Sequence, residues 1–349
     1  MSTNGDPVVS VIMPVKNEIR AISQCIEGFR AQTFPLTEFE IVIADGSTDG
    51  TREILRGYEK EIPGWLRVFD NPTGRIAEGY NIALRNARGK IVNGYVGHAF
   101  PAPDYVESVV KVLREDDTDM VGGMVIPLPA TGTLVARAIA ASLQSPFTVG
   151  RNAFTCDTRC TTTSTHWMAV KRAMIDRVGE FNEEFARGED CDWYERMIEA
   201  GGRAVFDPRV RSFYFPRDTL GGQFVAQIHN GANRMKLFLA TGRGMRFRHL
   251  LPLLLPLCWC CAGTLSFGFF PAVMSGGIVY AALLAAASVR IAGSPVRYWF
   301  CVSVATFLIH LGHSLGLLAG AMAFGAQSSM KLFKPDGGSS PRRRESRRQ

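Results

Sequence analysis

Three short segments of this chain carry residue types that could do chemistry. The strand-like run Glu40–Ala44 leads into Asp45-Gly46-Ser47, and a second run, Ile91–Val96, leads into Gly97-His98. The third segment is the acidic pair Glu189-Asp190. A carboxylate at a strand end can accept hydrogen bonds from a nucleotide base, although an Asp-Gly pair also forms ordinary turns. An imidazole can bind a transition metal through one ring nitrogen.

The acidic pair has a structural and a catalytic interpretation. Glu189 and Asp190 stand at the start of a helix predicted over Glu189–Ala200, where carboxylates complement the helix dipole. One carboxylate at this position could instead act as a general base, which any reaction that begins with attack by a hydroxyl requires. Asp192 lies two residues further on and would point elsewhere.

Alternating strands and helices would position these residues. The predicted strands are Val8–Met13, Glu40–Ala44, Leu66–Asp70 and Ile91–Val96, and the predicted helices are Ile19–Phe29, Thr51–Glu61, Ile76–Asn86 and Asp104–Arg114. This order predicts an α/β fold with a mostly parallel central sheet and helices on both faces. Ligands bind such sheets at the carboxyl ends of the strands. The loops Pro14–Glu18, Asp45–Gly50 and Gly97–Pro101 should therefore converge on one site.

The apolar residues are unevenly distributed along the chain, which has 349 residues and is 46% hydrophobic. His249–Met330 contains no acidic residue and two basic ones, Arg290 and Arg297. The apolar stretches are Leu250–Phe270, Ala272–Val289 and Tyr298–Ala326. Each approaches or exceeds the roughly 17–25 residues that cross a bilayer. We therefore expect transmembrane helices rather than a buried helical subdomain, since a water-facing surface needs more charge than this region has.

The net charge of +7 comes from the end of the chain. The tail Lys331–Gln349 contributes +5, and Arg290 and Arg297 contribute the rest, so Met1–Arg248 is neutral overall. Nucleic acid is thus a poor candidate partner. A basic tail beside a transmembrane segment indicates contact with anionic lipid. The eight cysteines form no zinc pattern and indicate reduced thiols in the cytosol.

These patterns divide the chain into four parts. We expect a cytosolic catalytic domain over 1–222, an amphipathic interfacial connector over 223–249, two or three membrane spans over 250–330 and a disordered basic tail over 331–349. Three full crossings would place the basic tail outside, against the positive-inside bias. Either one stretch does not cross, for which the first, with Pro252 and Pro256, and the third are the candidates, or the tail is an exception to the bias.

Separated blocks of the sequence occur in the order typical of one enzyme family. They are Ser10–Glu18, Ile41–Thr51 and Gly179–Asp190, together with the narrower signals Val96–Val106, Gly122-Gly123 and Ser145–Gly150. The first three blocks resemble the family 2 glycosyltransferases. The other three are similar to the branch that includes the succinoglycan-type exopolysaccharide transferases. The resemblance extends over roughly Val8 to Gly320.

The resemblance implies a GT-A fold, which is Rossmann-like, followed by transmembrane helices. It also implies a hexosyltransferase-type enzyme that uses a nucleoside-diphosphate sugar and inverts the transferred sugar. Carried over by position, the family's site residues would be Pro14 and Glu18 at the base and ribose, Asp45 on the base, Arg75 and Asn81 near the diphosphate, and Asp190 as general base.

The chain departs from the family pattern at the metal site. The family usually has Asp-x-Asp, or Asp-x-His in this branch, where this chain has Val96-Gly97-His98. Val96 offers no ligand atom, whereas His98 can bind a divalent metal. A lone histidine with water and diphosphate favours Mn²⁺ over Mg²⁺. Two alternatives stay open: a metal-free site stabilised by Arg75 and Arg151, and an inactive site.

Together, these features predict a multi-pass enzyme of the inner (plasma) membrane with its catalytic domain in the cytoplasm. It would move one sugar to a polyprenyl-linked glycan during polysaccharide synthesis. The processive synthases carry Gln-x-x-Arg-Trp where this chain has Gln227–Gly231, so single transfer is favoured. The alternatives are a catalytically degenerate scaffold that binds nucleotide sugars and a polyprenyl-phosphate sugar synthase.

Overall fold

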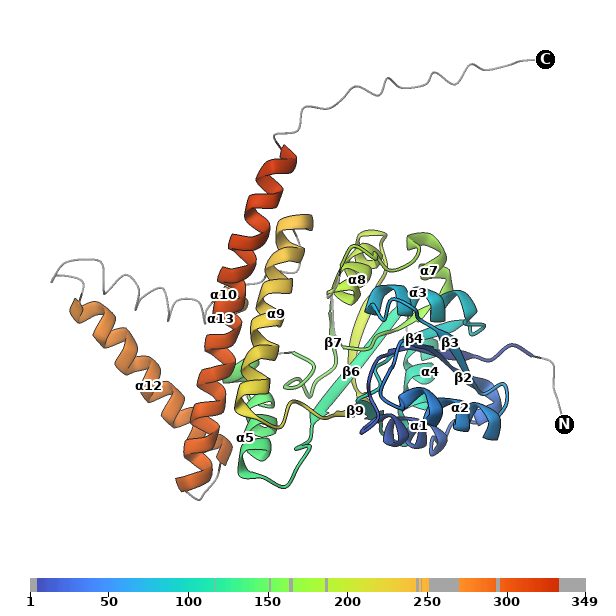
Figure 1. The fold of residues 1–349 in the computed structure, drawn as a ribbon, viewed down its shortest axis with the longest axis horizontal. Helices are drawn as coiled ribbons and strands as arrows, with labels where there is room; N and C mark the ends of the chain where they lie inside the picture. The colour runs from blue at the N-terminus through green and yellow to red at the C-terminus, as the bar shows by residue number, and fades with distance from the viewer. Residues whose placement is uncertain are drawn as a thin grey trace, which may run out of the picture.

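The chain forms an α/β part and a helical part, which lie side by side in the computed structural model (Figure 1). The described residues are 5–115, 117–150, 152–162, 166–185, 188–242, 245, 247–250, 270–292 and 296–332. Arg151, nearly all of the apolar stretch Leu250–Phe270 and the tail from residue 333 lie outside them, and so do the predictions made for those residues.

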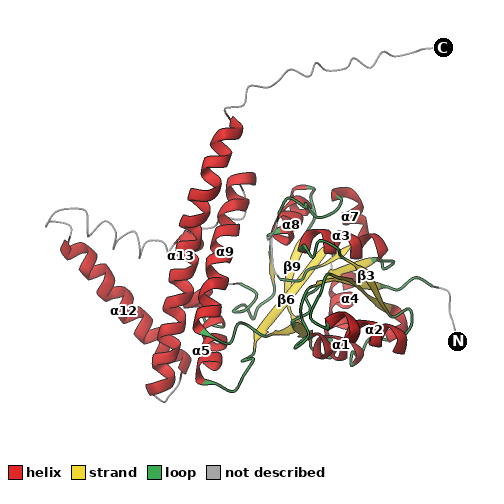
Figure 2. Cartoon of the chain, in the orientation of Figure 1, coloured by secondary structure: helices red, strands yellow, loops and turns green. Residues whose placement is uncertain are grey.

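The strands belong to one sheet that has helices on both sides (Figure 2). The strands are β1 (Val9–Val15), β2 (Phe39–Asp45), β3 (Leu66–Asp70), β4 (Ile91–Gly94), β5 (Ala99–Pro101), β6 (Met120–Pro127), β7 (Cys160–Thr161), β8 (Ala169–Lys171) and β9 (Ala204–Tyr214). The helices of this part are α1 (Ile22–Arg30), α2 (Thr51–Glu61), α3 (Ile76–Asn86), α4 (Tyr105–Glu115), α7 (Arg172–Val178) and α8 (Glu189–Glu199), with a 3₁₀ turn at Leu36–Glu38.

Parallel pairing dominates the half of the sheet that carries the predicted site. The strand order is β3-β2-β1-β4-β8-β6-β9-β5, with β7 paired to β9. Strand β1 pairs in parallel with β2 and β4, and β2 pairs in parallel with β3. Strand β8 runs antiparallel between β4 and β6, and β5 runs antiparallel to β9. The predicted mostly parallel sheet with helices on both faces is confirmed.

Side-chain alternation along the buried strands divides the core into two layers. In β2, Ile41 and Ile43 point into the layer beneath α1, α2 and α4, while Val42 and Ala44 point into the layer beneath α3, α7 and α8. All seven residues of β2 are buried, as expected for a central strand covered by helices on both faces. The central strands are therefore rigid, and the loops at their ends have fixed starting points.

A buried carboxylate at the beginning of β2 has a structural role. Glu40 accepts hydrogen bonds from Ser10 Oγ at 2.7 Å, Arg67 Nη1 at 3.0 Å and Arg88 Nη2 at 2.7 Å. Burial alone would raise the pKa of Glu40, but the hydrogen bonds, chiefly those from Arg88, hold it below its usual value. Glu40 is near the amino end of its strand, away from the loops that were predicted to bind ligand.

The helical part lies beyond the β6 and β9 side of the sheet (Figure 1). It contains α5 (Leu134–Leu143), α6 (Pro146–Val149), α9 (Leu220–Thr241), α10 (Phe247–Leu250), α12 (Phe270–Ala292) and α13 (Val296–Leu332). Ile139 and Leu143 of α5 pack against Val302 and Ile309 of α13. Thus α5, which precedes β8 and β9 in the chain, is part of the contact between the two parts.

Helix α13 is long and apolar enough to cross a membrane. Val296–Phe324 comprises 29 residues with a mean hydropathy of 1.6, and half of its apolar window is buried within the protein. At 1.5 Å per residue this length is about 43 Å. Tyr280–Ile291 of α12 is apolar but shorter. Among the described residues the structure thus supports one candidate span, where two or three were predicted.

Glycines bring α9 and α13 into backbone contact. A Cβ atom on Gly316 would lie 2.1 Å from the carbonyl oxygen of Ile228, and one on Gly231 would lie 2.3 Å from that of His313. Small residues at such crossings allow helix backbones to approach closely, which increases their van der Waals contact. The two helices therefore form one rigid pair.

Replacing Gly316 with Ala should destabilise this pair, because the added methyl group overlaps the backbone of α9. We expect a loss of about 1–3 kcal/mol, as for other overpacked sites, seen as a lower midpoint of thermal unfolding in detergent. The matched control is Gly221→Ala on α9, where nothing lies within 4 Å of the added atom. That variant should unfold at the wild-type temperature or above it. Equal midpoints for both variants would contradict the close packing.

Candidate active site

Hydrogen bonds join the loops that follow β1 and β2. Val15 and Asp45 are partners in the β1–β2 register, so both strands end at the same level. Beyond this point the Asn17 amide donates to Ser47 Oγ at 2.9 Å, and its side-chain Oδ1 accepts from the Thr48 amide at 2.8 Å. Asn17 has a positive φ of 58°, which turns its backbone toward the second loop. The predicted convergence of these two loops is therefore present.

The loop after β3 packs directly against the loop that follows Asp45. A Cβ atom on Gly46 would lie 2.7 Å from Gly74 Cα and 2.9 Å from the Asn71 carbonyl oxygen, so only glycine fits there. The Asn71 amide donates to the Asp45 carbonyl at 2.8 Å, and its Nδ2 donates to the Arg75 carbonyl at 3.0 Å. Asn71 thus connects the Asp45 loop to the start of α3.

The Asp45 carboxylate is fully buried and held from two sides. Its Oδ1 accepts from the Ser47 amide at 3.1 Å, and its Oδ2 accepts from Arg52 Nε at 2.8 Å. Arg52 also pairs with Asp70 at 2.9 Å. An ionised carboxylate has about four lone-pair positions, so two contacts leave acceptor capacity. Binding of a base by Asp45 stays a prediction, and the structure places the residue at the strand ends where that role requires it.

His98 and Glu18 form a pair across the loops after β4 and β1. His98 Nδ1 lies 2.8 Å from Glu18 Oε1, and the His98 side chain is 41% exposed. If Nδ1 carries the proton, the carboxylate orients the ring, and Nε2 keeps a lone pair for another partner. A Cβ atom on Gly97 would lie 3.2 Å from Glu18 Cγ, so the pair is closely packed.

The pair fits a metal whose other ligands come from the substrate. Within the described residues, no group of three or more His, Cys, Asp or Glu side chains could hold a metal ion. Val96 adds nothing, because its side chain packs against the core of the sheet. His98 Nε2 could still bind a metal, with the Glu18 carboxylate behind the ring, as is common among metal-binding histidines; that role stays a prediction. A diphosphate and water would have to complete the coordination.

The residues predicted near the diphosphate are bound to the loop before α8. Arg75 Nη2 donates to the Glu183 carbonyl, and Arg75 Nη1 pairs with Glu78 at 2.6 Å. Asn81 Nδ2 donates to the Phe181 carbonyl at 3.0 Å, while its Oδ1 accepts from the Phe181 amide at 2.9 Å. Both side chains therefore position the segment that leads to Asp190, and their contact with nucleotide stays a prediction.

Asp190 is the second residue of α8, and Trp193 of the same helix belongs to a stack of aromatic rings. Phe181 stacks on Tyr80 at 4.7 Å and on Trp193 at 4.0 Å between ring centroids. Asp190 Oδ1 accepts a hydrogen bond from the Cys191 amide at 2.8 Å. Burial raises the pKa of Tyr80, and the nearby carboxylate of Asp190 adds to this effect. Tyr80 is therefore neutral, and its hydroxyl donates to the Tyr95 carbonyl at 3.0 Å.

Pro14 lies on β1, close to the first turn of α3. It pairs with Ala44 in the register of β1 and β2, and a Cβ atom on Gly79 would lie 2.8 Å from Pro14 Cβ. The proline therefore supports the first turn of α3. Two connected sets of predicted residues result, one with Glu18, Asp45 and His98 and one with Arg75, Asn81 and Asp190, and Asn71 links them.

Sequence patterns did not single out His166, which lies near the catalytic candidate. Its ring is 4.9 Å from Phe154 and 6.0 Å from Trp167. Burial lowers the pKa of His166, while the nearby Asp190 carboxylate opposes that change. In the sequence His166 directly follows Ser145–Thr165, a segment rich in Thr, Cys and Gly that is typical of a long loop near a site.

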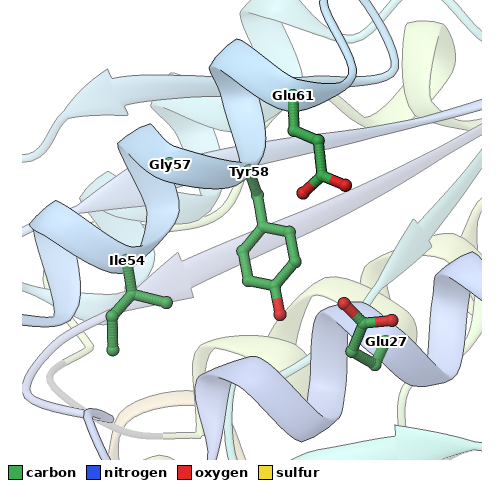
Figure 3. A pocket seen from close by; sticks show the side chains of 5 residues that line it. All are labelled: Glu27, Ile54, Gly57, Tyr58 and Glu61. Carbon is green, nitrogen blue, oxygen red and sulfur yellow. The ribbon is translucent and has the colours of Figure 1, made fainter.

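A hollow between α1 and α2 does not belong to this site. It is lined by Glu27, Ile54, Gly57, Tyr58 and Glu61 (Figure 3). Glu61 ends α2, about 15 Å along the helix from Thr51 at the strand ends. The hollow contains two carboxylates and no cationic side chain, so it is unsuited to a nucleotide diphosphate.

Comparison with known proteins gives matches over most of the chain. The family description "Glycosyl transferase family 2" matches residues 10–179. Glycosyltransferase AglE of Haloferax volcanii is 29% identical over 244 residues, which are 69% of this chain and 77% of that protein. Succinoglycan biosynthesis protein ExoA of Rhizobium meliloti is 28% identical over 317 residues, which are 88% of this chain and 92% of that protein.

A solved structure shares the fold. Mannosyltransferase PcManGT from Pyrobaculum calidifontis, in complex with GDP-Man and Mn²⁺, matches with a TM-score of 0.58 and 22% identity. The match covers 90% of this chain and 88% of that chain. The similarity shows that the α/β part has the GT-A fold.

Replacing Arg52 with Gln would remove one of the two contacts of the buried Asp45 carboxylate. We expect the free energy of unfolding to fall by about 1–3 kcal/mol, the cost of an unsatisfied buried group. Water around the half-exposed Arg52 keeps the loss below that of a fully buried pair. Urea unfolding followed by tryptophan fluorescence would measure it. Arg30→Gln, which breaks exposed pairs with Glu27 and Glu61, should change stability by less than about 0.5 kcal/mol. Equal losses would show that Asp45 does not depend on Arg52.

Proposed function

Because this chain is a glycosyltransferase with a family 2 domain over residues 10–179, we propose that it transfers one sugar from a nucleoside-diphosphate donor to a lipid-linked glycan, with inversion. The observation that carries this proposal is the link between the two sets of residues. Asn71 joins the loops of Asp45 to α3, and Asn81 of α3 holds the segment that leads to Asp190. Donor and acceptor groups can thus meet in one place.

In this mechanism Asp190 removes the proton from the acceptor hydroxyl as that oxygen attacks the anomeric carbon. The new glycosidic bond forms while the bond to the diphosphate breaks, and the nucleoside diphosphate leaves with the electron pair. A single positioned carboxylate meets the need for a base. The structure gives Asp190 no ion pair among the described residues, so its carboxylate is available for a proton.

The donor would lie across the strand ends. Asp45 would accept hydrogen bonds from the base, with Pro14 and Glu18 beside the base and ribose and Asn81 behind the diphosphate. Arg75 would face the negative charge that develops on the leaving group, an effect that is strong in a site shielded from water. A divalent ion held by His98 would supply further positive charge to the diphosphate. Mn²⁺ suits an imidazole ligand better than Mg²⁺ does.

The acceptor assignment rests on the helical part. Helix α13 has the length and composition of a membrane span, and α9 packs along it. A substrate with a polyprenyl anchor would therefore reach the α/β part from the membrane surface. We place the catalytic domain, residues 1–222, on the cytoplasmic side of the plasma membrane, with 223–249 at the interface, 250–330 forming the membrane part and 331–349 as a basic tail near the lipid.

Replacing Asp190 with Asn should reduce sugar transfer by about 10²–10⁴-fold, the usual contribution of a general base. The assay follows radiolabelled sugar from a panel of UDP- and GDP-sugars into a lipid extract that contains polyprenyl-linked glycans. Asp192→Asn is the control, because Asp192 pairs with Arg196 at 2.9 Å and should matter for stability rather than for chemistry. Full activity of Asp190→Asn would refute the base. An inert wild type with an active Val96→Asp variant would favour a degenerate scaffold.

Metal binding at His98 can be tested without turnover. UDP or GDP should raise the unfolding temperature of the wild type more with Mn²⁺ than without it, because a ligand that binds the folded state stabilises it. His98→Gln should lower the affinity for Mn²⁺ in the presence of nucleotide, measured from these shifts over a range of Mn²⁺ concentrations, at least tenfold. Glu18→Gln should lower that affinity by about 10-fold through loss of ring orientation. A nucleotide effect that is equally large with chelator in all three proteins would indicate a metal-free site.

A further inference from the structure

Helix α9 lies against the segment that carries the proposed base. Lys236 Nζ donates to the Glu184 carbonyl at 3.4 Å. Leu237 is buried, and its Cδ2 lies 4.0 Å from the position of a Cβ atom on Gly188, immediately before α8. Arg75 binds the preceding carbonyl, that of Glu183, from α3. The segment is therefore held between α3, where the donor would lie, and α9, which belongs to the helical part.

Arg234 lies three residues before Leu237 on α9. The two residues are therefore on the same side of the helix, because residues three apart share a helix face. Its Nη1 lies 3.5 Å from His249 Nδ1, and the His249 ring lies 6.3 Å from the ring of His313 on α13. Arg234 also interacts electrostatically with His166, as does Asp190. Nitrogen donors thus extend from the neighbourhood of the proposed base to the candidate membrane helix.

Along the sequence, α9 and the helical part that follows it carry charge of one sign. From Thr219 to Leu332 the sequence contains no aspartate or glutamate, while Arg234, Lys236, Arg243, Arg246 and Arg248 fall within a span of fifteen residues. An arginine with a histidine beside it offers a planar fork and a further N–H, which suit a phosphate group. No carboxylate within this stretch competes with such a phosphate.

We propose that Arg234, with His249 beside it, binds the phosphate of the lipid-linked sugar acceptor. The assignment rests on the proposed function, because it names how that acceptor is recognised. The phosphate of such a lipid lies between the polyprenyl chain and the first sugar. Arg234 likewise lies between α13, which would face the lipid, and His166, which neighbours Asp190. Binding there would hold the sugar of the acceptor toward the base.

The test measures binding of farnesyl diphosphate, farnesol and inorganic pyrophosphate to the full chain in dodecyl maltoside. Saturating UDP or GDP is present, so that the donor site is filled. The wild type should bind farnesyl diphosphate at least tenfold more tightly than either farnesol or pyrophosphate. Arg234→Gln should remove most of that preference, and His249→Gln should reduce it by a smaller factor. Lys236→Gln is the matched control on the same helix, and it should keep the wild-type preference.

Three outcomes would overturn the assignment. The first is an equal loss of farnesyl diphosphate binding in Arg234→Gln and Lys236→Gln, which indicates general attraction between basic residues and an anionic lipid. The second is binding of farnesyl diphosphate that occurs only when UDP or GDP is left out, which places it in the donor site. The third is unchanged binding in Arg234→Gln while nucleotide binding confirms that the variant is folded. A wild type that binds farnesyl diphosphate through Arg234 but binds no nucleotide would refute the transferase and leave this phosphate site standing.

Discussion

The side-chain amide of Asn81 holds the segment that leads to Asp190 on helix α3. It is almost completely buried and bonds Phe181, one hundred residues away, with both its oxygen and its nitrogen. The same nitrogen lies 2.8 Å from Glu183 Oε1. Each such bond contributes only about 1 kcal/mol net, but a buried amide without partners would cost about 1–3 kcal/mol for each unsatisfied group. The segment before α8 therefore has one stable position on α3, and the position of Asp190 follows from it.

The acidic side chains of the α/β part differ in their partners, and the partners decide what each can do. Glu40 is buried at the amino end of β2 and bonded to Ser10, Arg67 and Arg88, so its carboxylate stabilises the fold and is not available to a ligand. Asp45 is buried with one arginine and one amide, which fixes its position and leaves acceptor capacity. Asp190 accepts from the Cys191 amide beside it and interacts electrostatically with two buried neutral tyrosines, Tyr80 and Tyr194. A proton acceptor needs this last environment.

Local signals in the sequence were sufficient for many elements. Helices Thr51–Glu61 and Ile76–Asn86 have the predicted bounds, because apolar periodicity and flanking turn residues agree there. The composition of Ala130–Ala141 is typical of one helix, but the helix begins at Leu134, because Thr133 Oγ1 accepts a hydrogen bond from the Ala136 amide and caps it. This cap and the weak helix preference of the preceding Thr131 and Gly132 together set the start of the helix. Composition alone did not reveal the cap.

The candidate site was less predictable than the strands that support it. Glu18, Asp45 and His98 follow predicted strands, so topology alone brought them together. The contact of Arg75 with Glu183 joins segments 108 residues apart, and no periodicity in either segment encodes it. The same holds for His166, whose neighbour Asp190 lies on a different element. Contacts of this kind depend on how β8, β6 and β9 continue the sheet in mixed directions, which the alternation of strands and helices in the first third of the chain does not determine.

The contact between the two parts of the chain explains why an apolar helix is partly buried in protein. Ser142 of α5 and Thr306 of α13 hydrogen-bond at 3.1 Å within the apolar contact of these helices, and His310 Nε2 lies 2.9 Å from the Thr148 carbonyl. A helix surrounded only by lipid would gain nothing from these groups, because polar atoms in hydrocarbon need protein partners. The segment from α5 to α6 supplies those partners. It also continues toward Phe154 and His166, so the same contact that satisfies α13 fixes the α/β part, with its proposed base, against the helices that would meet the lipid.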